Sequence, residues 1–113
     1  MVIYYPPGGG GGAVSFTAKS AELRDADETV AQELTLDTEG NKLLEIYVKA
    51  TASTNIYLDV STDNASWVEG YDAWLSVTEV KETYWNGFRY VRLRSDPAGA
   101  SGDTVTMILS SKP

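Results

Sequence analysis

Strict alternation of apolar and polar residues is the feature that most constrains the fold of this 113-residue chain. Apolar side chains occupy every second position in four short segments, namely 44–48, 56–60, 91–93 and 105–109. This repeat of two is typical of a β-strand with one buried face and one solvated face. No apolar stripe with helical spacing persists anywhere, and at most one turn of helix is expected, at Ser20–Arg24. The pattern therefore predicts an all-β protein.

Turn-forming residues separate the expected strands. Further strands are expected at 14–19 and 30–36, with a weaker one between 67 and 77. Residues typical of turns lie between the strands, at 38–41, 53–55, 62–64, 86–87 and 96–102. Six to eight short strands at this spacing predict an antiparallel, jelly-roll-like β-sandwich. The expected core comprises Leu44, Ile46, Val48, Leu58, Val60, Val91, Leu93 and Met107.

The first twelve residues differ in composition from the rest of the chain. Two prolines and five consecutive glycines follow a β-prone run that consists of Val2, Ile3, Tyr4 and Tyr5. We expect residues 1–12 to form an arm and linker, and residues 13–113 to form the β-sandwich domain. A short β-prone segment on a glycine tether can add to the sheet of another molecule. The four residues are therefore predicted to bind a neighbouring polypeptide.

The composition excludes several classes of enzyme and partner. The chain has no histidine and no cysteine, which removes Ser–His and Cys–His catalysis and thiolate metal sites. Its formal charge of −7 disfavours binding to a phosphate backbone. No apolar run reaches the ~20 residues of a membrane span, and the N-terminus lacks the features of a secretory signal. We expect no catalytic residue, metal, cofactor, nucleic-acid partner or membrane partner.

One passage carries a family resemblance. A strand and turn at 56–64 are followed by Trp67 and then by Arg89-Tyr90-Val91-Arg92-Leu93-Arg94. Over residues 56–95 this order resembles the second half of discoidin-like jelly-roll modules. It is also similar to small β-sandwich virion proteins of phages and archaeal viruses, of the decoration type. In purely structural terms, Trp67 would fill one end of the sandwich.

Aromatic and arginine side chains supply the candidate binding residues. The candidates for a protein interface or a glycan site are Tyr71, Trp74, Tyr84, Trp85, Arg89, Arg92 and Arg94. Some of the aromatic residues are expected to fill the core instead. Arg92 and Arg94 fall on one face of a strand, where they are expected to pair with carboxylates of a neighbouring strand or subunit.

The leading functional hypothesis is a non-enzymatic virion structural protein, such as a capsid decoration (cement) protein or another capsid- or tail-associated protein. Its expected partners are other copies of itself and a major capsid or tail protein, and its expected location is the virion, after synthesis in the host cytoplasm. One alternative is an extracellular, carbohydrate-binding β-sandwich module. A further alternative is an extracellular filament subunit joined by donor strands.

Overall fold

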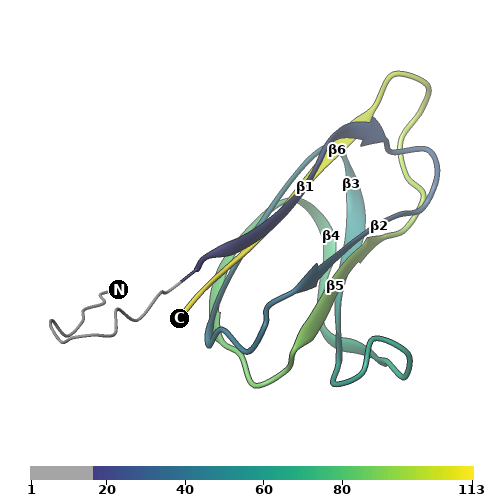
Figure 1. Ribbon diagram of the computed structural model, residues 1–113. Coiled ribbons are helices and arrows are strands. Elements are labelled where there is room, and N and C mark those ends of the chain that lie inside the picture. The colour runs from purple at the N-terminus through teal and green to yellow at the C-terminus, as the bar shows by residue number, and fades with distance from the viewer. Residues whose placement is uncertain (1–16) are drawn as a thin grey trace, which may run out of the picture.

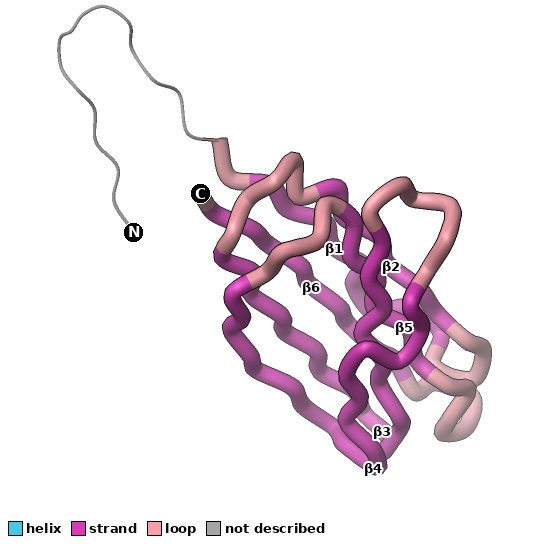
Figure 2. Tube along the Cα trace, turned by 90° about the horizontal axis from the view of Figure 1, so that it is seen from below, coloured by secondary structure: helices cyan, strands magenta, loops and turns pink. Residues whose placement is uncertain are grey.

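The computed structural model describes residues 17–113, which form six antiparallel strands (Figure 1). The strands are β1 (Lys19–Asp27), β2 (Gln32–Asp37), β3 (Leu43–Ser61), β4 (Val68–Trp85), β5 (Tyr90–Ser95) and β6 (Thr104–Lys112). Within this part of the chain there is no helix, and so none able to cross a membrane (Figure 2). The all-β prediction is confirmed. The predicted arm lies outside the described residues.

A long, bent hairpin of β3 and β4 organises the fold. The first part of β3 pairs with β6 on one side and with the last part of β4 on the other. The second part of β3 pairs with β5 and with the first part of β4. Outer strands complete the arrangement, because β1 pairs with β6 and β2 pairs with β5. The sheet is thus folded over into two layers.

We call these layers I and II. Layer I has the order β1-β6-β3-β4 and uses residues 43–50 and 79–85 of the two long strands. Layer II has the order β2-β5-β3-β4 and uses residues 56–61 and 68–77. The chain passes between layers at a corner built from 28–31 and 96–103 and from the bend of the hairpin. Figure 1 shows this corner at the upper right, and the C-terminus at the opposite end.

The core lies between the two layers. All eight residues expected in the core are buried, with exposed fractions of 2% or less. Leu36, Ala50, Ile56, Val80, Val105 and Leu109 complete the buried apolar cluster. In β3 the even-numbered side chains point inward on both sides of the bend, so one continuous alternation supplies both layers. The period-two pattern therefore identifies the core directly.

Three local expectations are wrong. The predicted turn at 53–55 is part of β3, where buried Thr54 donates a hydrogen bond to the carbonyl of Asp96 at the corner. The possible helical turn at Ser20–Arg24 lies within β1, because pairing with β6 satisfies its backbone. Of the strand expected at 14–19, residues 14–16 lie outside the described residues, 17 and 18 are not in a strand, and Lys19 begins β1. Long-range pairing overrides local propensity in both of the first two cases.

A close contact at the corner gives a first test of the fold. Gly99 has a φ of +75°, and a Cβ atom added there would lie 2.6 Å from Oδ2 of Asp103 and 2.9 Å from Cβ of Ala52. Gly102 has a φ of +99° and open space around it. Both alanine variants incur backbone strain, but only Gly99→Ala adds overpacking, which typically costs about 1–3 kcal/mol.

We therefore expect Gly99→Ala to unfold at lower urea concentration than Gly102→Ala, by an amount equivalent to about 1–3 kcal/mol. Equal midpoints for the two variants would contradict the corner packing.

Candidate functional site

A buried carboxylate lies on the outer face of layer II. The register of β3 and β5 places Asp59 opposite Arg92, and Tyr57 opposite Arg94. Nε of Arg92 donates to Oδ2 of Asp59 at 2.8 Å, and Nε and Nη2 of Arg94 donate to its two oxygens at 2.5 and 3.0 Å. The N–H of Gly70 donates a further bond of 2.9 Å. Burial acts to raise the pKa of Asp59, but these donors hold it below its ordinary value.

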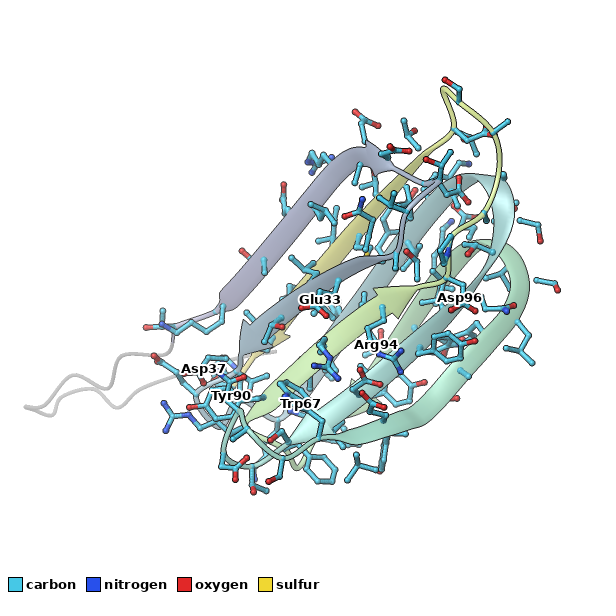
Figure 3. The ribbon with its side chains drawn as sticks, turned by 90° about the vertical axis from the view of Figure 1, so that its right-hand side faces the viewer. Glu33, Asp37, Trp67, Tyr90, Arg94 and Asp96 are labelled. Carbon is cyan, nitrogen blue, oxygen red and sulfur yellow. The ribbon has the colours of Figure 1, made fainter. Side chains whose placement is uncertain are left out.

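Each of these two arginines also stacks on an aromatic ring. The guanidinium of Arg92 lies 4.3 Å from the ring centroid of Trp67, and that of Arg94 lies 4.9 Å from the ring of Tyr57. The Tyr57 hydroxyl donates to the carboxylate of Asp96 at 2.7 Å. Because Trp67 packs on Arg92, it is half-buried on the outer face of layer II and is not part of the core cluster (Figure 3).

The arginine network serves to stabilise layer II rather than to bind a ligand. The side chains of Arg92 and Arg94 are only 14% and 29% exposed, and both are engaged by Asp59. Arg89 lies apart from them, paired with Asp37 through two hydrogen bonds of 3.0 Å. Arg89 therefore does not belong to the network around Asp59.

Half-buried aromatic residues close the β4 side of the sandwich. Trp74 from layer II and Tyr84 from layer I meet edge to face, with ring centroids 6.4 Å apart. The Tyr84 hydroxyl donates a short hydrogen bond to Asp72, which lies on the other half of the same strand. Burial, and then the bond to Asp72, raise the pKa of Tyr84. Both rings pack against the core cluster, so they serve the fold.

The other two aromatic candidates are exposed. Tyr71 is 56% exposed and touches Phe88 edge to face at 5.4 Å, whereas Trp85 is 83% exposed. Val68 and Leu75 are exposed as well. β4 therefore carries four of the five large hydrophobic side chains that are exposed in the described residues. β4 is thus the surface strand most suited to contact another molecule.

An open groove of about 380 Å³ lies on the outer face of layer I. It is lined by Glu45, Ile46, Tyr47, Lys81, Glu82, Thr83, Ile108 and Ser110. Strand register explains its floor, because Tyr47 of β3 lies between Lys81 of β4 and Ile108 of β6. An aromatic ring and a branched aliphatic side chain are thus adjacent at outward-facing positions.

Polar groups surround this apolar floor. The hydroxyl of Ser110 donates to Oε1 of Glu45 at 3.1 Å, and Nζ of Lys112 lies 3.1 Å from the same oxygen. Lys112 and Ser110 lower the pKa of Glu45, so its carboxylate is ionised at neutral pH. Thr83 lies opposite Glu45 in the sheet and adds a hydroxyl. The groove therefore combines one aromatic ring with an acceptor and several hydroxyl groups.

Sequence reasoning did not single out this groove. Tyr47 occupies one of the outward-facing positions between Ile46 and Val48, and its neighbours follow only from strand register. The available signal was weak: Tyr47 and Ile108 are large apolar side chains at positions that the alternation assigns to the outer face.

A second hollow, of about 350 Å³, lies at the corner. Its lining is Asp25, Asp27, Thr29, Ser101, Gly102, Asp103 and Thr104. Asp27 accepts hydrogen bonds from the backbone and side chain of Thr29, and Asp103 accepts them from Ala100 and Thr51. Residues 17–113 contain no group of three or more acidic side chains that could hold a metal ion. These carboxylates therefore organise turns.

Comparisons with known proteins reveal one distant likeness. No family model and no curated protein matches the chain. The carbohydrate-binding module CpGH89CBM32-5 of Clostridium perfringens, solved with GalNAc-β-1,3-galactose, is similar in structure over 80% of this chain and 94% of its own. The TM-score is 0.43 and the identity 14%. This neighbour is a discoidin-like β-sandwich, and the comparisons identify no virion protein.

Proposed function

We propose that this chain is a non-catalytic module that binds neutral carbohydrate in the groove of layer I. The observation that carries the proposal is the apolar floor of Tyr47 and Ile108 within a rim of hydroxyl and carboxylate groups. A sugar ring has an apolar face that packs on an aromatic ring and hydroxyls that hydrogen-bond at its edge. Small-molecule sites generally combine an apolar surface with a few polar groups in this way.

The charges of the groove favour a neutral ligand. Charged side chains at the groove are paired, Glu45 with Lys112 at 3.1 Å and Lys81 with Glu79 at 3.8 Å, so the groove has no large excess charge that would select an ionic sugar. The ionised carboxylate of Glu45 can accept charge-assisted hydrogen bonds from sugar hydroxyls. Hydrolysis is not part of the proposal, since glycosidases require an acid with a raised pKa, whereas that of Glu45 is lowered.

The test is binding to an array of neutral and acidic oligosaccharides, followed by calorimetry on the best ligand. We expect Tyr47→Ala to weaken binding at least tenfold, about 1.4 kcal/mol, because the stacking surface is lost. Trp85→Ala is the matched control, since it removes an exposed aromatic ring outside the groove and should leave affinity unchanged. No binding on the array, or loss of binding only with Trp85→Ala, would refute the groove assignment.

Assembly on a virus particle is the second candidate function. It is favoured by the concentration of exposed apolar side chains on β4. In this hypothesis the chain is a non-enzymatic decoration or tail-associated protein that contacts further copies and a major capsid or tail protein. Co-sedimentation of the purified chain with candidate particles tests it, and a chain that never sediments with a particle would count against it.

A further inference from the structure

Among residues 17–113, no strand pairs with the outer edge of β4. In the described part of the chain, β4 forms a ladder only with β3. Its last seven residues, Glu79–Trp85, pair with β3 in unbroken register, whereas its first half is interrupted by the positive φ angles of Gly70 and Ser76. The regular stretch therefore leaves a row of backbone N–H and C=O groups open on its far side. Such an edge can accept another strand.

Charge argues against pairing of this edge with β4 of a second copy. β4 carries Glu69, Asp72, Glu79 and Glu82 but only one cationic residue, Lys81, which gives four negative charges against one positive charge. Within the Glu79–Trp85 stretch, Glu79 and Glu82 outnumber Lys81, so two such edges side by side would each bring one net negative charge to the new ladder. Like charges across a strand pair are destabilising. The edge is better suited to a strand without acidic residues.

The sequence of the first sixteen residues includes a β-prone segment without acidic residues. They contain no Asp, Glu, Lys or Arg, so their side chains carry no formal charge. Val2–Tyr5 consists entirely of residues with high β-propensity, and Pro6 and Pro7 prevent the strand from continuing. An uncharged four-residue strand fits within the seven-residue regular edge.

We propose that Val2–Tyr5 of one copy pairs with the Glu79–Trp85 edge of β4 in a second copy. The described chain begins beside β1, and β1 and β4 form opposite edges of layer I. Donor and acceptor edges on opposite sides produce a head-to-tail contact, which generates a ring or a filament. Residues 6–16 span at most ~36–40 Å when extended, enough to reach an adjacent molecule.

Each single contact between two copies can be weak. The exposed indole of Trp85 lies at the end of the acceptor stretch, where an added apolar strand would cover it. The five glycines make ordering of the arm entropically costly, so one contact is weak. Repetition around a closed assembly compensates through avidity. This inference does not depend on carbohydrate binding in the groove.

The experiment measures mass and hydrogen exchange of the full chain as functions of concentration. Light scattering should give a mass above that of the monomer at high concentration. Amides of residues 79–85 should exchange at least tenfold more slowly there than in dilute solution. Ile3→Pro removes a backbone donor from the arm, so it should abolish both effects. Gly10→Pro, in the linker outside the pairing segment, is the matched control and should preserve them.

Three results would overturn the proposal. The first is a wild-type chain that is monomeric at every concentration. The second is an Ile3→Pro variant that assembles as well as the wild type. The third is protection of residues 79–85 that is independent of concentration and lost in Ile3→Pro, which would place the arm on its own β4. Tyr47→Ala should assemble normally, so failure of the carbohydrate proposal is distinguishable.

Discussion

Asp59→Ala is expected to lower the free energy of unfolding by about 3–5 kcal/mol, because two largely buried guanidinium groups lose the buried carboxylate between them and Arg92 keeps only the exposed Glu69 as an acidic partner. Asp59 has no exposed surface, and Arg92 and Arg94 both donate to it from the neighbouring strand. The N–H of Gly70 would lose its acceptor as well. Urea unfolding monitored by tryptophan fluorescence measures the loss.

Arg89→Ala is the matched control for this prediction. Arg89 also forms a bidentate pair with an aspartate of an adjacent strand, Asp37, but its side chain is 53% exposed. Exposed pairs contribute little to stability, so this variant should unfold near the wild type. Similar losses for the two variants would contradict the assigned role of the buried carboxylate.

For Asp59→Ala, the stability lost relative to the wild type should also depend on pH, and the direction of that dependence follows from the pKa of Asp59. In the folded state the pKa of Asp59 lies below its ordinary value, so its ionised form stabilises the fold. This contribution is complete above the unfolded pKa of about 4 and is lost as pH falls through the folded pKa. The stability difference between wild type and Asp59→Ala should therefore shrink below about pH 4. A difference that stays constant down to pH 2 would contradict the assignment.

The core was predictable from sequence because the alternation of a half-buried strand is a local signal. Leu44, Leu58 and Leu93 are separated by many residues in the chain, yet each stands in its own period-two segment and is buried. No knowledge of strand order is needed to assign such residues to the inner face. The fold class follows from the same local evidence.

The bend of β3 and the length of β4 were not predictable in this way. Thr54 and Asn55 have the composition of a turn, but the chain continues as a strand because the corner loop supplies partners. Asp96 accepts hydrogen bonds from both of these side chains at the bend. Those partners are about forty residues away, so the local sequence cannot reveal them.

The candidate sites could be predicted from the sequence only in part, for a related reason. The sequence placed Arg92 and Arg94 on one face but did not identify Asp59 as their acceptor, since that requires the register of β3 with β5. The groove likewise depends on the register that sets Tyr47 beside Ile108. Alternation assigns a side chain to a face, whereas register determines its neighbours.

Leu58→Ala is expected to destabilise the protein by about 2–5 kcal/mol, through lost burial and a residual cavity. Leu58 is 2% exposed in the second part of β3, where it lies between Leu93 of β5 and Asp72 of β4. Its side chain points between the layers at a position flanked by strands on both sides, so collapse of the neighbours around the cavity is restricted. The loss is measured as a lower urea midpoint with an unchanged slope.

Leu75→Ala removes the same atoms from the surface and serves as the control. Leu75 is 63% exposed on β4, so its truncation should change stability by no more than about 0.5 kcal/mol. If the two variants were equally stable, layer II would not be packed on layer I through β3, and the bent hairpin would be wrong. A large loss for Leu75→Ala in concentrated solution alone would instead indicate that β4 is covered by another molecule. The pair of leucines thus tests the inside of the sandwich and the exposed surface of β4 with one chemical change.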